Sequence, residues 1–296
     1  MQPIQYIERS TGQVKSENPP GEGFLKFLYH HPLGELSLQL LVKRKLLSEV
    51  YGRRMKSTAS RTQIEPFLET YEIDPGEFEK PVENFESFND FFIRKLKPGS
   101  RIIAEGLTSP ADGKVLAFSS VEEVHDFYVK GQRFTLEKFL QNEALAKKHR
   151  GSAMVIIRLA PPDYHRFHFP AAGIPQGPVS IKGRYYSVSP YATKENFGRV
   201  FCENKRSYTR LDLENGAEII LAPVGATMVG SIFHTYQPDQ AIEKGAEMGY
   251  FSFGGSSLLM LIEDSAISID SDLLENTRNG FETSVKMGEQ IGKLGA

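Results

Sequence analysis

Residues 153–170 read AMVIIRLAPPDYHRFHFP, an apolar run followed by two prolines and a group of ionisable side chains. The run is short, rich in β-branched residues and ended by the prolines, which is typical of a buried strand. Comparable runs are GKVLAF at 113–118, VSIKGRYYSV at 179–188, AEIILAPV at 217–224, MVGSIF at 228–233 and SLLMLIE at 257–263. Gly, Pro and Asn turns separate them, so the sequence predicts a mostly antiparallel, β-rich body.

The first hundred residues have a helical pattern instead. Residues 22–57 carry seven Lys or Arg against three Glu, with apolar residues at helical spacing. This basic amphipathic helix can lie in a membrane interface or pack on the protein, and its periodicity does not decide between the two. Further helices are expected at about 61–71 and at 87–96, where Ser87 opens a capping pattern.

The predicted fold class is therefore α+β, with a helical N-terminal portion (1–105) followed by a β-rich body (106–296). One helix is expected within the body, near residues 135–149. The tail after Ser265 is polar and is expected to be loosely ordered.

Composition excludes several classes of protein. The chain has 296 residues with 35 Lys and Arg against 37 Asp and Glu, so it lacks the basic excess of a general nucleic-acid binder. Cys202 is the single cysteine, which excludes an internal disulfide and a four-cysteine zinc site and favours a reducing compartment. There is neither an apolar stretch long enough to span a membrane nor a leader pattern, so we expect a soluble or membrane-surface protein.

The segment DYHRFHFP places Asp163, His165, Arg166 and His168 within six positions after a predicted strand. Two histidines three residues apart could be structural, could serve as acid and base, or could bind a metal. A metal site needs a third ligand, and no nearby HxH, HExxH or Cys/His cluster supplies one, so we expect no metal.

Two further motifs could contribute chemistry. Asp112 lies in SPADGKV, where Asp-Gly is also an ordinary turn signal. Gly254 and Gly255 precede Ser256 and interrupt a run that would otherwise continue as one strand, which is typical of a bulge. The functional alternative is that Ser256 attacks the preceding carbonyl, because glycine offers no Cβ to hinder the approach. The GxSxG pattern of serine hydrolases is not met, since residue 258 is Leu.

Six motifs in this order resemble those of the phosphatidylserine decarboxylases, over residues 85–263. They are FNDFFIRKLKPGSR at 88–101, PADGKV at 110–115, VKGQRFTLEKFL at 129–140, YHRFHFP at 164–170, VGATMVGSI at 224–232 and GGSS at 254–257. The chain departs from the family twice: Lys205 stands where the family has Glu in Asn-Glu-Arg, and Ser257 stands where it has Thr.

The resemblance implies a proenzyme that cuts itself between Gly255 and Ser256, leaving chains 1–255 and 256–296. Ser256 would attack the Gly255 carbonyl, and the resulting ester would lose the chain by β-elimination. Hydrolysis of the remaining dehydroalanine would give a covalent pyruvoyl group, the only cofactor implied. By the same analogy His168 would be the base and Asp112 would orient it. His165 would donate a proton to the substrate or orient it.

The resemblance also implies a substrate, phosphatidylserine, which is converted to phosphatidylethanolamine and CO2. A diacyl lipid stays in the bilayer. The resemblance therefore favours a membrane contact for the basic helix and a peripheral location on the cytoplasmic face of the cell membrane. The cleaved chains would remain together as an α/β heterodimer, and the protein could also form a homodimer. Two alternatives are a lipoyl-type carrier, whose turn lysine is absent at Ala226, Thr227 and Met228, and a zinc peptidase, whose ligands are missing.

Overall fold

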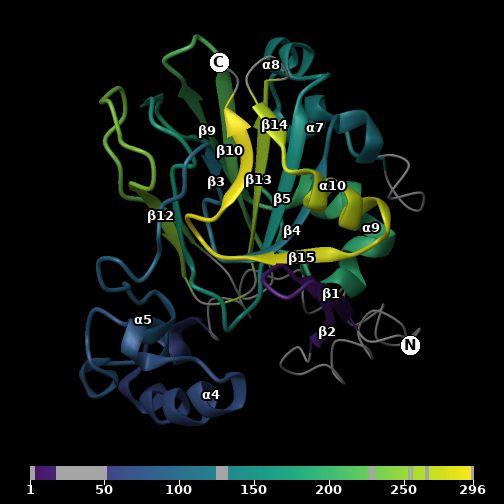
Figure 1. Ribbon diagram of the computed structural model, residues 1–296. Coiled ribbons are helices and arrows are strands. Elements are labelled where there is room, and N and C mark those ends of the chain that lie inside the picture. Colours follow the sequence, from purple (N-terminus) through teal and green to yellow (C-terminus); the bar gives the residue numbers. More distant parts are fainter. Residues whose placement is uncertain are drawn as a thin grey trace.

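The computed structural model describes residues 4–17, 52–124, 133–226, 231–252, 254, 256–263 and 267–294. It confirms an α+β fold built on a large sheet (Figure 1). In sheet order the strands are β2 (Gln13–Glu17), β1 (Ile4–Glu8), β15 (Glu282–Val285), β4 (Gly113–Phe118), β5 (Ala153–Leu159), β13 (Ser256–Ile262), β10 (Glu218–Gly225), β9 (Arg206–Asp212) and β7 (Ile174–Pro175), with β8 (Val179–Ile181) also on β9. Within the described residues every pair in this sheet is antiparallel except β1 with β15.

Two smaller sheets accompany the large one. The first contains β11 (Ile232–His234), β12 (Glu247–Phe251) and β6 (Arg166–His168), and the second contains β14 (Ile267–Ile269), β16 (Gln290–Leu294) and β3 (Leu107–Thr108). The predicted single strand interrupted by glycines is thus two strands, β12 and β13, in different sheets. Gly254 lies between them with φ +131°, a conformation that side chains with a Cβ rarely adopt. Gly254 therefore marks a change of sheet rather than a bulge.

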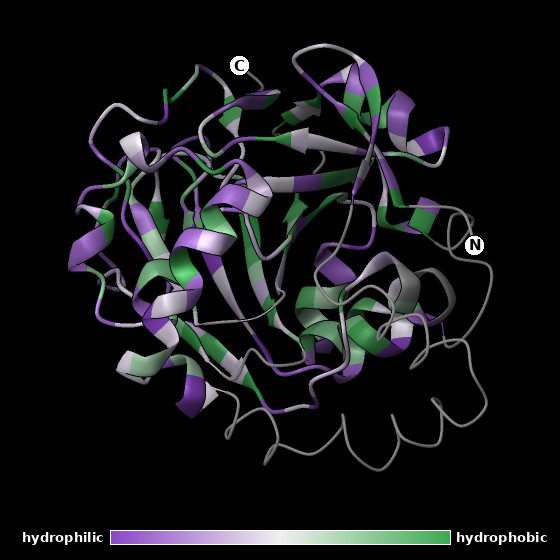
Figure 2. Ribbon diagram, turned by 90° about the horizontal axis from the view of Figure 1, so that it is seen from below, coloured by the Kyte–Doolittle hydropathy of each residue, from purple (hydrophilic) through white to green (hydrophobic). Residues whose placement is uncertain are grey.

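The large sheet is buried on both faces, which explains why its central strands are apolar without interruption. Along β13, Leu258 and Met260 face one hydrophobic core, while Leu259 and Leu261 face a second core. The second core is covered by α7 (Leu136–Leu140), α8 (Glu143–Lys148) and α9 (Pro190–Glu203) (Figure 1). In Figure 2 the central strands are largely green, and purple residues gather on the helices and loops around them.

The N-terminal helices form a small unit below the sheet in Figure 1. It contains η2 (Thr58–Gln63), α4 (Ile64–Tyr71), η3 (Pro75–Glu77), η4 (Val82–Asn84) and α5 (Phe88–Phe92). Ser87 caps α5 by accepting a hydrogen bond from the Asp90 N–H, as the capping pattern predicts. Phe85, Phe88, Phe91 and Phe92 are buried at its centre.

The structure corrects three expectations about secondary structure. Residues 4–17 are not helical but form a hairpin on β15, and the division at residue 105 stays a prediction. The helix expected near 135–149 is two helices, because Gln141 between them adopts φ +50°. The tail after Ser265 is ordered in its described part, with α10 (Ser271–Arg278) and three strands. Along β15, partly exposed Glu282 and Ser284 alternate with buried Thr283 and Val285, which is the strand period of two.

The basic amphipathic segment at 22–57 lies mostly outside the described residues, which resume at residue 52. In the described part of the chain, no helix is both long enough and apolar enough to cross a membrane.

Candidate active site

Ser256 is the first residue of β13, opposite Leu159 of β5 and Gly225 of β10. It has no exposed surface, because both neighbouring strands are themselves buried. Its Oγ lies 3.3 Å from Nδ1 of His165, which is 91 positions away in the sequence. Gly255, the other side of the expected cleavage, lies outside the described residues.

His165 is held in one tautomer. Its Nε2 lies 3.0 Å from the Ala160 carbonyl oxygen, which can only accept a hydrogen bond. Nε2 therefore carries the proton, and the lone pair of Nδ1 faces the Ser256 hydroxyl. Burial, together with the positive charge of Arg94, lowers the pKa of His165 to about 3, so the ring is neutral near pH 7. The ring of Phe92 stacks on it with centroids 3.9 Å apart, so α5 closes this side of the site.

His168 has partners of its own. Nδ1 lies 2.9 Å from the Gly245 carbonyl oxygen and Nε2 lies 3.2 Å from the Tyr164 hydroxyl. Nδ1 is therefore the protonated nitrogen, and Nε2 accepts from Tyr164. Burial lowers the pKa of His168, while the charges of Glu247 and Asp112 act in the opposite direction.

Asp112 makes its hydrogen bonds away from the histidines. Its carboxylate accepts from Nε and Nη2 of Arg101, at 3.1 and 2.7 Å, and from the Met287 N–H at 2.8 Å. The residue after Asp112 is Gly113. A Cβ at this position would lie 2.6 Å from the Arg158 carbonyl oxygen, which explains the glycine. The structure thus brings His165 to Ser256, and it gives His168 and Asp112 other partners in the uncut chain.

Comparison with known proteins agrees with the motifs. Residues 88–293 match the family model described as phosphatidylserine decarboxylase. The chain is 50% identical over 292 residues to a phosphatidylserine decarboxylase proenzyme of Fusobacterium nucleatum subsp. nucleatum, covering 98% of this chain and 97% of the relative. It is 43% identical to proenzymes of the same name from Ruminiclostridium cellulolyticum (98% and 97% covered) and Chlamydia pneumoniae (99% and 98% covered).

The chain belongs to the phosphatidylserine decarboxylase family. The resemblance stated from six motifs is therefore confirmed, and the carrier and zinc-peptidase alternatives lose their support. The roles given to Ser256, His165, His168 and Asp112 are not decided by family membership and stay predictions.

The family's Asn-Glu-Arg motif, here with Lys205 at its centre, supports the main chain next to the site. Asn204 donates to the carbonyls of Tyr186 and Gly225, and Gly225 is the residue opposite Ser256. Arg206 is almost fully buried and donates to the carbonyls of Lys138 and Phe139 at the end of α7. Asn204 and Arg206, on either side of Lys205, thus donate their side-chain hydrogen bonds to main-chain carbonyls.

Sequence reasoning missed the Ala160 carbonyl, Phe92 and Arg94 as neighbours of His165. A main-chain acceptor has no sequence signal, because every residue carries one. Phe92 and Arg94 lie in the motif FNDFFIRKL, for which the capping pattern at Ser87 predicted a helix and nothing about His165. In the described part of the chain, no group of three or more His, Cys, Asp or Glu could hold a metal ion.

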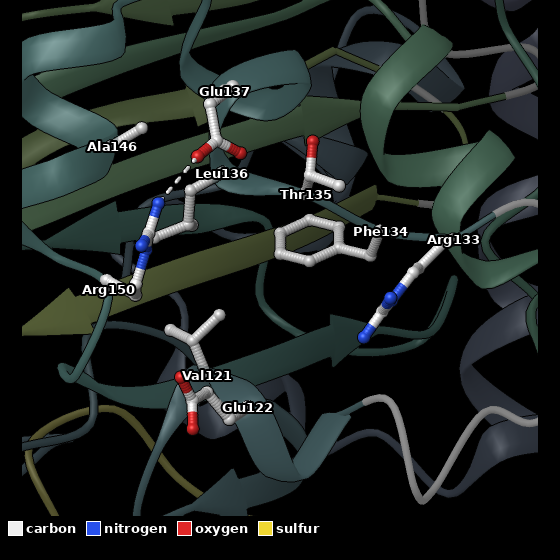
Figure 3. A pocket seen from close by; sticks show the side chains of 9 residues that line it. All are labelled: Val121, Glu122, Arg133, Phe134, Thr135, Leu136, Glu137, Ala146 and Arg150. Atoms are coloured by element: carbon white, nitrogen blue, oxygen red, sulfur yellow. Dashed lines mark ion pairs between the residues drawn. The ribbon is translucent and has the colours of Figure 1, made fainter.

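A cavity of about 470 Å³ lies elsewhere, between η5 (Val121–Glu123), α7 and α8 (Figure 3). Arg150 and Glu137 in its wall form an ion pair at 3.6 Å. η5 follows β4 at the end of the sheet where Phe118 pairs with Met154, whereas Ser256 pairs with Leu159 at the other end of β5. At about 3.3 Å per residue the two places are separated by most of the length of a strand. The cavity is therefore separate from Ser256.

Proposed function

We propose that this chain is a self-processing, pyruvoyl-dependent decarboxylase that converts phosphatidylserine to phosphatidylethanolamine and CO2. The observation that carries the proposal is the contact between the Ser256 hydroxyl and Nδ1 of His165 in a site without exposed surface. Ser256 directly follows Gly255 in the sequence, and the relatives that match the whole chain are named proenzymes.

Self-cleavage uses only atoms of the chain. The Ser256 oxygen attacks the carbonyl carbon of Gly255, the bond from that carbon to the Ser256 nitrogen breaks, and an ester replaces the amide. Loss of the Cα proton then expels residues 1–255 as a carboxylate and leaves dehydroalanine. Water converts this residue to a pyruvoyl group and releases ammonia.

Two histidines are candidates for the base, and different properties favour each. Distance favours His165, whose Nδ1 already accepts from the hydroxyl. Basicity favours His168, because a base with a pKa near 3 takes up a proton poorly near neutral pH. Burial lowers the pKa of His168 as well, but the charges of Glu247 and Asp112 act against that effect. We therefore assign the proton transfer in self-cleavage to His168 with Asp112, and we assign His165 to the decarboxylation, as the group that donates a proton to the substrate or orients it.

The residues around position 256 fit a pyruvoyl group. In the uncut chain the position has no exposed surface, and the imidazole of His165 lies within hydrogen-bond distance. Such a group supplies a carbonyl that accepts the electron pair left when CO2 departs. His165, which contacts residue 256, is then our candidate for the group that orients the substrate or moves a proton at its α-carbon.

Residues 256–296 stay with the rest of the protein after cleavage, because β13 lies between β5 and β10 in the sheet. The two chains therefore form an α/β heterodimer. A lipid substrate requires contact with the membrane surface, which we assign to the basic segment at 22–57 and to the cytoplasmic face.

Mass spectrometry of the purified protein tests the proposal. We expect two chains, 1–255 and 256–296, with the small chain lighter by one ammonia than an unmodified Ser256 terminus predicts. Release of CO2 and phosphatidylethanolamine from phosphatidylserine vesicles tests the second reaction. An intact chain without decarboxylation would overturn the proposal, and a free serine terminus would refute the pyruvoyl group alone.

A further inference from the structure

His165 depends on a tight turn at residues 160–163. The Ala160 carbonyl oxygen accepts two hydrogen bonds, from the Asp163 N–H at 2.9 Å and from Nε2 of His165 at 3.0 Å. The direction of this carbonyl decides which imidazole nitrogen carries the proton. Any group that fixes the turn therefore acts on the nitrogen that faces Ser256.

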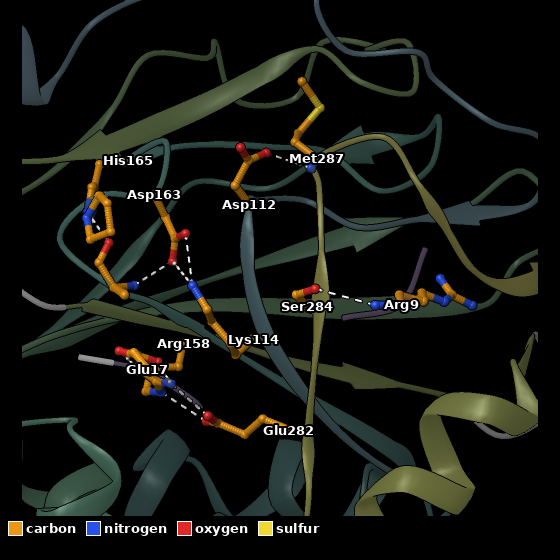
Figure 4. A network of polar contacts seen from close by, with 12 residues as sticks. Arg9, Glu17, Asp112, Lys114, Arg158, Asp163, His165, Glu282, Ser284 and Met287 are labelled. Carbon is orange, nitrogen blue, oxygen red and sulfur yellow. Dashed lines mark hydrogen bonds and ion pairs between the residues drawn. The ribbon is translucent and has the colours of Figure 1, made fainter. Parts of the chain in front are cut away.

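The Asp163 side chain closes the same turn from the other side (Figure 4). One of its oxygens accepts from the Ala160 N–H at 2.7 Å, and Nζ of Lys114 lies 3.0 and 3.1 Å from the two oxygens. Burial alone would lower the pKa of Lys114, but Asp163 and Glu17 outweigh it and hold the pKa above its usual value. Lys114 and Asp163 thus form a charged pair that joins β4 to the turn.

Arg94 holds the turn from the helical unit. Its Nη2 donates to the Pro162 carbonyl at 3.1 Å, and its guanidinium carbon lies 4.8 Å from the centre of the Phe91 ring. Arg94 and Lys114 are the two charged groups whose fields oppose protonation of His165. The turn is therefore held from β4, from the helical unit and by its own aspartate.

We propose that Lys114 and Asp163 are positioning residues for His165, and that their ion pair fixes the turn that keeps Nδ1 of the imidazole directed at residue 256. This inference rests on the proposed function. Neither residue is a hydrogen-bond partner of Ser256, and neither takes part in a step of the proposed reaction.

A purely structural ion pair is the competing explanation, and the neighbouring strand offers one for comparison. Arg158 lies beside Lys114 in the β4–β5 register and binds Glu17 of β2 and Glu282 of β15, each with an oxygen 2.6 Å from Nη2 (Figure 4). These partners join the N-terminal hairpin to the sheet rather than to the turn. Loss of a partner in either set destabilises the fold, but only loss of Asp163 or Lys114 should disturb His165.

The experiment compares Asp163→Ala, Asp163→Asn and Lys114→Met with the control Glu282→Gln. The first readout is the ¹⁵N spectrum of the histidine rings in uncleaved Ser256→Ala protein, with the His165 signals identified by their loss in His165→Gln. Wild-type turn geometry predicts a single tautomer protonated at Nε2. Asp163→Ala should mix the tautomers, whereas Glu282→Gln should not.

The second readout is kcat and KM for phosphatidylserine, per processed chain. We expect kcat to fall on the order of 10²-fold in Asp163→Ala with KM nearly unchanged, because a small displacement of a reacting group has an effect of this size. Asp163→Asn, which retains an acceptor for the Ala160 N–H, should lose less. Glu282→Gln should lower the unfolding temperature and leave kcat as it is.

An unchanged His165 tautomer in Asp163→Ala, or a wild-type kcat, would overturn the inference. Failure of the proposed function gives a different result, since the wild-type chain would then neither cleave nor release CO2. The tautomer measurement reports on Asp163 in both cases, because it needs no processing.

Discussion

The Ala160 carbonyl oxygen lies 3.0 Å from Nε2 of His165, and this contact leaves Nδ1 as the nitrogen that faces Ser256. In the Ser-His-Asp relay of serine proteases a carboxylate performs that orienting task. Here a neutral main-chain oxygen does so, and it cannot stabilise an imidazolium as a carboxylate would. The low pKa of His165 agrees with this difference.

Ser256→Ala should abolish both self-cleavage and decarboxylation, because alanine has neither the nucleophile nor the leaving oxygen. Denaturing electrophoresis should show one full-length band. The matched control is Ser257→Ala, which removes the neighbouring buried hydroxyl and should still be cut. A cleaved Ser256→Ala chain would show that another residue breaks the bond.

The two histidines should differ in the step that their loss affects. His168→Ala should accumulate the uncut chain, with the cleavage rate reduced at least about 10²-fold, as expected for a lost general base. His165→Ala should be cut but should decarboxylate poorly. If His165→Ala is the variant that stays uncut, the nearer histidine is the base and our assignment must be exchanged.

Acid should destabilise the uncut protein through His165. Its folded pKa of about 3 lies below the value of about 6.5 in an unfolded chain, so the unfolded state binds the proton first as pH falls. The contribution of His165 to stability should therefore be complete above pH 6.5 and decline towards pH 3, by about 5 kcal/mol in all. Urea unfolding of Ser256→Ala protein at pH 7 and pH 4.5 measures the decline, and adding His165→Gln should make it smaller.

Arg158→Met should destabilise the fold by about 3–5 kcal/mol, because it leaves the carboxylates of Glu17 and Glu282 without their buried partner. Urea unfolding of the uncut protein measures this. The triple variant Arg158→Met, Glu17→Gln and Glu282→Gln should recover much of the lost stability. Equal destabilisation in the single and triple variants would show that packing of the arginine, not its charge, is what matters.

The basic segment should bind anionic membranes, with each cation near the surface contributing about 1 kcal/mol, and less at high salt. Changing six cations to Gln should weaken sedimentation with anionic liposomes and turnover on bilayer substrate, yet leave self-cleavage intact. The six are Lys43, Arg44, Lys45, Arg53, Arg54 and Lys56. Unchanged sedimentation at low salt would mean that the membrane contact lies elsewhere, and loss of cleavage would mean that these cations support the fold.

The central strands could be predicted from the sequence because they are buried on both faces and therefore apolar throughout, as in β5 and β13. The N-terminal hairpin and β15 could not, because IQYIE and ETSV are too polar to stand out. The separation of β12 from β13 was missed for a related reason, since EMGYF continues into the glycine run without a break in composition.

Of the site, the sequence supplied Ser256 and both histidines but not which histidine lies nearer the serine. The order of His165 and His168 along the chain does not tell which of them lies nearer to Ser256. The answer depends on how the turn at residues 160–163 directs His165, and that turn is held by Lys114 and by main-chain atoms that carry no local signal.

The contact between Ser256 and His165 joins residues 91 positions apart, across strands that are not neighbours in sequence. On the proposed mechanism Ser256 must also reach His168, which lies in β6, and a chain that has not inserted β13 between β5 and β10 cannot bring this serine and its base together. Self-cleavage then acts as a checkpoint on folding. Only correctly assembled copies acquire the reactive carbonyl, and misfolded copies remain chemically inert towards the amines of the cell.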